Sequence, residues 1–138
     1  NTYIENKLKE YDYTYTNFAL DLGYKEHLSH KIYASADFLL MPSRVEPCGL
    51  NQMYSMRYGT VPVVRYTGGL RDTVEDISTG GAGLNFTYAG VDDIVHAMSR
   101  ALEIYNQKGV MEDLIHANMN FDFAWEKSAE KYIALYNS

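Results

Sequence analysis

The sequence predicts an α/β fold, a Rossmann-like parallel sheet with helices on both faces. Short apolar runs alternate along the whole chain with longer segments in which apolar residues recur every three or four positions. Such alternation is typical of strand–helix–strand units, whose right-handed crossovers build a parallel sheet covered on both sides. A length of 138 residues, with 46% apolar and 22% charged residues, fits a single folded domain over residues 1–138 rather than a disordered chain.

The first third of the chain predicts helices and strands in alternation. Apolar residues at helical spacing among lysines and glutamates predict a helix over residues 3–11, and residues 27–35 predict a second one. Alternation predicts a short strand over residues 17–22, and the nearly continuous apolar run at residues 37–41 is typical of a strand buried on both faces. A complete mononucleotide-binding half begins with a strand, so this chain is expected to lack a first βα unit.

The middle of the chain predicts two further strands and the helices that follow the strands. Pro47 suits the first turn of a helix over about residues 49–58, which Gly59 ends. A strand over residues 61–64 is followed by Gly68-Gly69, which opens a helix over residues 70–76. The last predicted strand covers residues 83–86.

The remainder of the chain predicts helices only. Apolar residues keep a helical pattern over residues 91–105, and Asp92 and Asp93 at its start suit the helix dipole. Gly109 is expected to separate this helix from a short one over residues 111–118. A final helix, about residues 124–136, has an apolar face that is expected to join the core. The tyrosines near the N-terminus are expected to pack against the edge of the sheet.

Charge and cysteine content argue against several classes of protein. A net charge of -6 argues against a nucleic-acid partner, because nucleic-acid-binding proteins carry a basic face. No apolar run approaches the ~18 residues of a membrane span, and the N-terminus has no secretory leader pattern, so no membrane partner is expected. The single cysteine, Cys48, has no partner for an internal disulfide, which predicts a reducing, cytoplasmic compartment.

One window departs from this acidic average. Residues 42–71 hold four arginines and a single acid, Glu46, so their net charge is +3. Two loops in this window, residues 42–50 and 65–70, leave strand ends and enter helices, whose N-termini favour anions. Gly68 and Gly69 would let a phosphate approach the backbone. Neither loop has the glycine pattern of a nicotinamide dehydrogenase or a P-loop NTPase.

Glu46 has two interpretations. As an ordinary loop acid, it is simply solvated. As a site residue, its carboxylate would accept hydrogen bonds from sugar hydroxyls and stabilise an oxocarbenium-like charge. An anion site beside one acid is what a sugar phosphate or a nucleotide sugar requires.

Residues 41–74, MPSRVEPCGLNQMYSMRYGTVPVVRYTGGLRDTV, closely resemble bacterial glycogen synthases and plant starch synthases. Gly23-Tyr24 and the stretch FAWEKSA at residues 123–129 extend the resemblance. These enzymes are retaining glycosyltransferases of the GT-B fold. The resemblance implies that the chain is most of their C-terminal, nucleotide-sugar-binding domain, without its first βα unit. It implies ADP-glucose as the donor, an α-1,4-glucan as the acceptor, and no metal or other cofactor.

The same resemblance has implications for the domains and for individual residues. The final helix would cross toward the missing N-terminal domain, which would leave its apolar face exposed or in contact with another molecule in this chain, and the isolated chain would be inactive. Glu46 matches the active-site glutamate that contacts the donor glucose near the reacting carbon, and Tyr24 matches a tyrosine near the adenine. The other expected binding residues face the sugar or hold the diphosphate: Cys48, Gly49, Leu50, Thr67, Gly68 and Gly69.

Other interpretations stay open. The wider retaining family often has a second glutamate eight positions after the first, and here that position is Tyr54, which favours the bacterial and plant type. A related transferase that uses a UDP- or GDP-sugar is one alternative, and a non-catalytic module that binds nucleotide or glucan is another. His27 and His30 lie one helical turn apart but lack a third metal ligand, so no metal site is expected. Cys48 is expected to be a small buried residue rather than a nucleophile.

Overall fold

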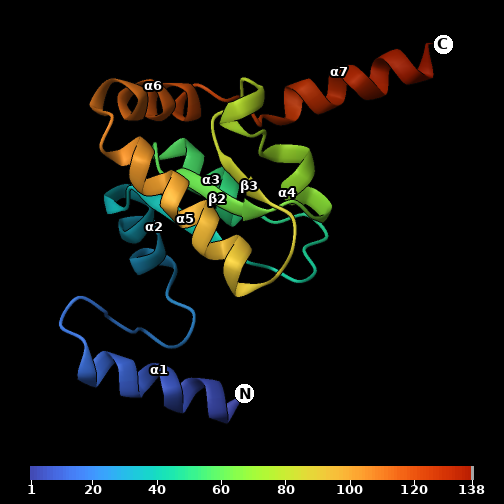
Figure 1. Ribbon diagram of the computed structural model, residues 1–138. Coiled ribbons are helices and arrows are strands. Elements are labelled where there is room, and N and C mark those ends of the chain that lie inside the picture. Colours follow the sequence, from blue (N-terminus) through green and yellow to red (C-terminus); the bar gives the residue numbers. More distant parts are fainter. Residues whose placement is uncertain (138) are drawn as a thin grey trace.

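Three parallel strands form one sheet in the computed structural model, which describes residues 1–137 (Figure 1). The strands lie in the order β1 (Phe38–Met41), β2 (Val61–Arg65) and β3 (Leu84–Phe86). Met41 is opposite Val64 and Arg65 is opposite Phe86, so all three strands end at the same edge of the sheet. The predicted parallel, Rossmann-like sheet is confirmed.

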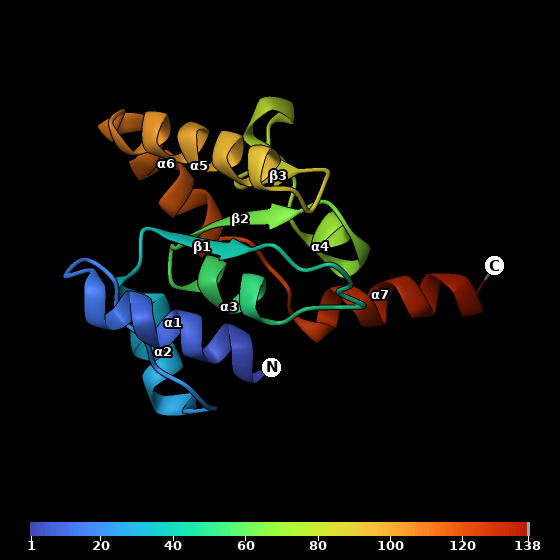
Figure 2. The same ribbon diagram turned by 60° about the horizontal axis from the view of Figure 1, so that its bottom comes forward.

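Helices cover both faces of this sheet. The helices of the described chain are α1 (Thr2–Thr14), α2 (Glu26–Ser35), α3 (Asn51–Arg57), α4 (Gly68–Thr73), α5 (Val91–Tyr105), α6 (Lys108–Met119) and α7 (Trp125–Tyr136), with a 3-10 turn, η1 (Ile77–Thr79). The terminal helices α1 and α7 do not cover the sheet. Figure 2 shows α5 above the strands and α3 below them. The helices predicted at residues 27–35, 49–58, 91–105 and 124–136 are therefore confirmed, with small shifts at their ends.

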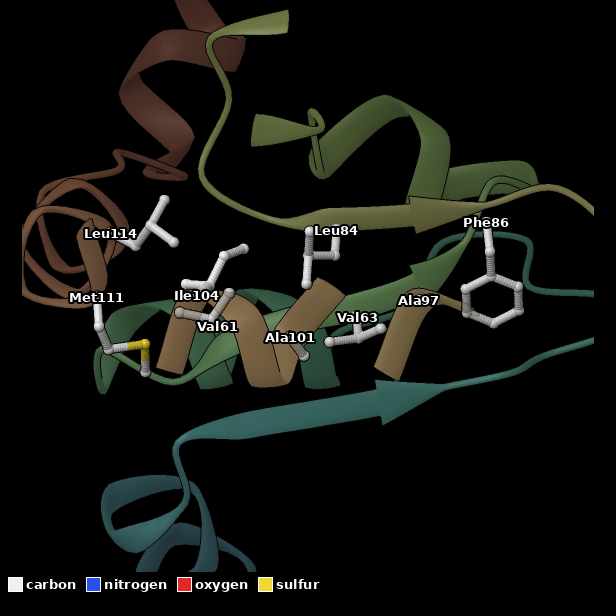
Figure 3. Close-up of a cluster of buried hydrophobic side chains, with 9 residues drawn as sticks. All are labelled: Val61, Val63, Leu84, Phe86, Ala97, Ala101, Ile104, Met111 and Leu114. Atoms are coloured by element: carbon white, nitrogen blue, oxygen red, sulfur yellow. The ribbon is translucent and has the colours of Figure 1, made fainter. Parts of the chain in front are cut away.

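The core is organised by the alternation of side chains along β2. Val61 and Val63 belong to the buried cluster on the α5 side, and Val64 belongs to a second cluster that includes α3 and α4. Figure 3 shows the first cluster, to which β2, β3, α5 and α6 contribute Val61, Val63, Leu84, Phe86, Ala97, Ala101, Ile104, Met111 and Leu114. Burying each large apolar side chain stabilises the fold by about 1.5–3 kcal/mol. The loop that leaves β2 therefore starts from the best-packed strand.

The strand predicted at residues 17–22 does not form. Phe18 donates its backbone N–H to the Tyr15 carbonyl at 3.2 Å, and Leu20 donates its N–H to the Asp12 carboxylate at 2.8 Å. These local bonds satisfy the backbone in an irregular connection, so it does not need a neighbouring strand.

Other predicted details also differ for local reasons. Leu40 on β1 is 39% exposed rather than buried, because β1 is an edge strand and α5 packs on β2 and β3. Helix α4 ends at Thr73, earlier than predicted, because Asp76 caps η1 by accepting the Ser78 N–H at 3.0 Å. Gly109 lies inside α6 and does not separate two helices.

The terminal helices α1 and α7 extend away from the body of the molecule (Figure 1). Neither helix contains a buried residue. Tyr13 is 94% exposed and Trp125 is 83% exposed. The predictions that the N-terminal tyrosines pack the sheet edge and that the last helix joins the core are therefore wrong, because the sheet lies out of reach of both apolar faces.

Candidate active site

The candidate site lies at the edge where the strands end. The first loop, residues 42–50, links β1 to α3, and the second loop, residues 67–69, follows β2 and opens α4. Seven of the predicted site residues come from these loops: Glu46, Cys48, Gly49, Leu50, Thr67, Gly68 and Gly69. In open parallel sheets, ligands bind at this edge. The fold therefore brings together residues that are about twenty positions apart in the sequence.

The two loops pack backbone against backbone, and two glycines allow it. Gly69 donates its N–H to the Glu46 carbonyl oxygen at 3.0 Å. A Cβ added to Gly69 would overlap the Cys48 carbonyl, and one added to Gly68 would overlap the Glu46 carbonyl. Gly68 also has a φ of +47°, in the left-handed region that favours glycine. The glycines expected to admit a phosphate therefore have a second role, because they let the second loop close on the first.

A buried glutamine on α3, Gln52, links the same two loops through hydrogen bonds. Gln52 has no exposed surface, and its Nε2 donates to the carbonyls of Cys48 at 3.2 Å and Gly49 at 3.0 Å. The same nitrogen lies 3.1 Å from the Thr73 hydroxyl oxygen, which accepts from it and donates its own proton to the Gly69 carbonyl at 2.7 Å. This chain of hydrogen bonds connects the carbonyls of both loops. Neither Gln52 nor Thr73 was predicted from the sequence as part of the site.

Arg65, at the end of β2, holds the start of the first loop through hydrogen bonds to backbone carbonyls. Its Nη1 donates to the Arg44 carbonyl at 2.7 Å and to the Ser43 carbonyl at 3.3 Å, and its Nε donates to the Thr87 carbonyl at 3.1 Å. A charged donor makes such hydrogen bonds stronger than those between neutral groups. Arg65 thus ties the loops after β1 and β3 to β2. We refer to the two loops with Gln52, Arg65 and Thr73 as the loop cluster.

Glu46 is held at both ends by the loop cluster. Its carbonyl accepts from Gly69, and its partly buried carboxylate accepts a hydrogen bond from the Ser43 hydroxyl at 3.3 Å. A carboxylate with a fixed backbone and a local donor has fewer orientations to lose when a ligand binds. Such a group accepts hydrogen bonds from hydroxyls and stabilises nearby positive charge.

The turn after Glu46 is open to solvent. Cys48 is exposed, which corrects the expectation that it is buried, and Leu50 is 55% exposed. Gly49 has a φ of +72°, and this conformation redirects the chain into α3. The turn is therefore accessible to a ligand that approaches the ends of the strands.

Tyr24 lies just before α2, and β1 follows α2 in the chain. Its ring is 86% exposed and lines a cavity of about 300 Å³ together with Tyr33, Asn51 and Tyr54. Asn51 and Tyr54 lie at the start of α3, directly after the first loop. Burial raises the pKa of the Tyr33 hydroxyl, so that hydroxyl stays neutral near pH 7. The cavity thus offers aromatic rings beside the loop cluster.

The arginines of the positive window separate in the fold. Arg44 and Arg65 lie at the loop cluster. Arg57 instead donates to the Met119 carbonyl at 2.8 Å and ties α3 to the end of α6. The Arg71 Nε is 3.5 Å from Oδ1 of Asp72, and both side chains are more than half exposed. The window therefore spreads its positive charge over several sites.

His30 takes part in packing between α2 and α3. Among residues 1–137, no group of three or more His, Cys, Asp or Glu side chains is placed to hold a metal ion. The His30 ring packs against Tyr33, Tyr54 and Tyr58, and the Tyr58 hydroxyl lies 3.2 Å from His30 Nδ1. No helix in this described part of the chain is long and apolar enough to cross a membrane.

Comparison with known sequences gives one consistent result. Residues 12–115 match the family model described as glycosyl transferases group 1. The chain is 47% identical over 138 residues to a glycogen synthase from Flavobacterium johnsoniae, an alignment that covers 99% of this chain and 29% of that protein. It is 49% identical over 137 residues to a glycogen synthase from Thermodesulfovibrio yellowstonii, covering 98% of this chain and 27% of that protein. The chain therefore spans less than a third of the length of these curated relatives.

Two solved structures are similar to the whole chain. The catalytic domain of starch synthase IV from Arabidopsis thaliana, bound to ADP and acarbose, has a TM-score of 0.86 and 36% sequence identity. That match covers 99% of this chain and 30% of the other. Sucrose-phosphate synthase from Thermosynechococcus elongatus has a TM-score of 0.70 and 25% identity, and its match covers 97% of this chain and 33% of the other.

Proposed function

The chain belongs to the group 1 glycosyl transferases, and on that premise we propose that it forms the nucleotide-sugar-binding part of a glycogen or starch synthase. Its α/β fold is that of the GT-B glycosyltransferases among its structural neighbours. The proposed reaction transfers glucose from ADP-glucose to the non-reducing end of an α-1,4-glucan with retention of configuration. The proposed setting is the cytoplasm, with a second, N-terminal domain that supplies the acceptor side.

The arrangement of Glu46 in the loop cluster is the observation that carries this proposal. Gly69 holds its backbone at 3.0 Å, and Ser43 donates to its carboxylate at 3.3 Å. In the proposed complex the carboxylate contacts the donor glucose and stabilises positive charge that develops at the reacting carbon. The open turn at Cys48, Gly49 and Leu50 faces the sugar, and its rigidity limits the cost of binding.

The other predicted residues take roles that match their places in the fold. Thr67, Gly68 and Gly69 hold the diphosphate of the donor. Tyr24 stacks on the nucleobase with its exposed ring, in an interaction worth about 0.5–1.5 kcal/mol by analogy with aromatic pairs. No metal is required in this proposal, because side-chain and backbone donors neutralise the departing ADP. The isolated chain is expected to have no turnover, because the domain that supplies the acceptor side is missing from it.

The variant Glu46→Gln in the intact protein tests the proposed role of this residue. The amide removes the negative charge but preserves the shape, so we expect glucose transfer to fall at least about 100-fold, a size typical for loss of one electrostatic contact in an active site. Calorimetric affinity for ADP should stay within twofold, because the acid acts on the sugar. Glu103→Gln, at an exposed position on α5, is the matched control and should leave both quantities unchanged. Normal turnover in Glu46→Gln would favour the non-catalytic binding module.

The identity of the nucleotide needs a separate measurement. Calorimetric titration of ADP, UDP and GDP against the intact protein should show a clear preference for ADP. Tyr24→Ala should weaken ADP binding about two- to tenfold, the loss expected for one stacking contact. Equal affinity for the three nucleotides would overturn the assignment of ADP-glucose as the donor.

A further inference from the structure

A second concave surface lies on the β3 side of the sheet, beside the loop cluster, with which it shares Thr73. It is a depression of about 830 Å³ bounded by α4, η1, the end of β3, the middle of α5 and Phe121. Figure 1 shows α4 and α5 on either side of β3 at this place. The volume falls within the range of about 300–1,000 Å³ that is usual for ligand sites. None of the residues assigned above to the donor lines it.

The floor of this depression is built in advance by a partly buried ion pair. Arg100 donates through Nη2 to Oδ1 of Asp76 at 2.6 Å and through Nη1 to Oδ2 at 3.1 Å. The Asp76 carboxylate also accepts the backbone N–H groups of Ser78 at 3.0 Å and Asn85 at 2.6 Å. These bonds fix η1, β3 and α5 relative to one another. The surface therefore does not need to be ordered when a ligand arrives, which lowers the cost of binding.

The charges around the depression favour a neutral ligand. Two arginines and three carboxylates line it. Because charges of both signs are mixed there, the surface attracts neither an anion nor a cation strongly. Arg100 and Asp76 already neutralise each other. The side chains of Arg71 and Asp72 are 57% and 67% exposed, and Nε of Arg71 lies 3.5 Å from Oδ1 of Asp72. Because both side chains are exposed, both can still form hydrogen bonds with a ligand. Donors and acceptors side by side suit a molecule that carries many hydroxyl groups.

Tyr66 adds an aromatic face to this polar surface. Its ring is 50% exposed, and its backbone N–H donates to the Phe86 carbonyl at 2.8 Å, which fixes the base of the side chain between β2 and β3. A half-exposed ring on a fixed backbone stacks against the apolar face of a sugar ring at small entropic cost. Tyr66 directly precedes the second loop, so the depression begins beside the loop cluster.

We propose that this depression binds a stretch of neutral oligosaccharide, an α-1,4-glucan chain, at a site distinct from the donor site. Tyr66 stacks on one sugar ring, and Arg71 and Asp72 bind its hydroxyl groups. The identity of the glucan rests on the proposed function, whereas the preference for a neutral, hydroxyl-rich chain rests on the lining alone. A chain held here would stay close to the enzyme while its free end is extended.

The test measures calorimetric binding of maltoheptaose to the intact protein. Tyr66→Ala should raise the dissociation constant about two- to tenfold, which corresponds to one lost aromatic stacking contact. Asp72→Ala, an exposed position that leaves packing intact, should also weaken binding. Tyr88→Ala is the matched control, because Tyr88 is 72% exposed near the same edge but does not line the depression. ADP affinity should stay within twofold in all three variants.

The outcomes separate this proposal from the proposed function. Unchanged maltoheptaose binding in both Tyr66→Ala and Asp72→Ala would overturn the site even if the intact protein transfers glucose. Weakened maltoheptaose binding in both variants would support the site even if the protein failed to use ADP-glucose. Stronger protection of the depression from hydrogen exchange by inorganic phosphate than by maltoheptaose would overturn the neutral ligand class. An equal loss of binding in Tyr88→Ala would overturn the assignment to this surface.

Discussion

The loop cluster and the terminal helices contrast sharply in how their residues are held. In the cluster, Gly69, Gln52 and Arg65 join segments that are distant in sequence through backbone carbonyls. In α1 and α7, apolar residues keep helical spacing but none is buried. Both regions have regular sequence patterns. Within the described chain, only the loop cluster is packed against neighbouring segments, whereas the apolar faces of α1 and α7 are left exposed.

This contrast shows that the candidate site is held in place by contacts among residues of one short stretch of the chain. Residues 42–73 contain every member of the loop cluster, and β2 at its centre is almost fully buried. No residue of α1 or α7 is buried, and most helical stability in proteins comes from packing of an apolar face. The cluster is therefore expected to be stiff, whereas the terminal helices add little to the stability of the sheet.

The largest expected change in the free energy of unfolding comes from a substitution at the closest contact between the two loops, Gly69 against Cys48. In Gly69→Ala the new methyl group overlaps the Cys48 carbonyl, so one loop must move. We expect a loss of about 2–3 kcal/mol in the free energy of unfolding, the upper range for overpacking, measured by urea denaturation. Gly90→Ala is the matched control, because nothing lies within 4 Å of the added group. It should cost at most about 1 kcal/mol, because Gly90 is the N-cap of α5, where alanine is less favourable than glycine. Equal stability of both variants would show that the loops are not tightly packed.

A smaller effect is expected at the Asp76–Arg100 ion pair, on the β3 side of the sheet. Burial opposes the charged form of Asp76, but hydrogen bonds from Arg100, Ser78 and Asn85 outweigh it and lower the pKa of the carboxyl to about 2. A lowered pKa stabilises the fold above the unfolded value of about 4, and this stabilisation is lost as the pH falls toward 2. Asp76→Asn should therefore cost up to about 2 kcal/mol near pH 7 and flatten the dependence of stability on pH between 2 and 4.

The control for that experiment is Asp92→Asn, at an exposed position in the first turn of α5. It should keep the acid dependence of the parent chain in urea denaturation followed from pH 2 to 7. If Asp76→Asn kept the same dependence as well, the ion pair would not contribute to folding in the way described.

The smallest effect is expected in the terminal helices. Tyr13 is 94% exposed, so Tyr13→Ser removes no buried contact and should change the unfolding free energy by less than about 0.5 kcal/mol. The same urea titration measures it. A loss above 1 kcal/mol would mean that α1 packs on the sheet in solution, and the contrast between the two regions would disappear.

The sequence predicted the sheet well because its strands have strong local signals. The runs at β1, β2 and β3 are mostly apolar, Pro42 follows β1 and Gly83 precedes β3, and the α5 pattern is regular over its full length. The failures occur where a tertiary feature decides the outcome. Residues 17–22 alternate like a strand but have no strand to pair with, and the apolar face of α7 has no sheet to cover.

The candidate site was only partly predictable. The order of residues in the two loops identified Glu46 and the glycines, and the fold places them together as expected. Gln52 and Thr73 are 21 positions apart, and nothing in their spacing indicates the hydrogen bond between them. Arg65 was counted among charges for an anion, because sequence cannot show that backbone carbonyls already surround it.

The central claim is that the loop cluster acts as one unit that positions Glu46, and a double-mutant cycle on kcat of the intact protein tests it most directly. Gln52→Leu removes the buried amide that bonds the Cys48 and Gly49 carbonyls, and Glu46→Gln removes the carboxylate itself. If Gln52 acts through Glu46, Gln52→Leu lowers kcat in the parent but has little further effect in Glu46→Gln. Additive losses, with the double variant slower by the product of the two single effects, would contradict the claim.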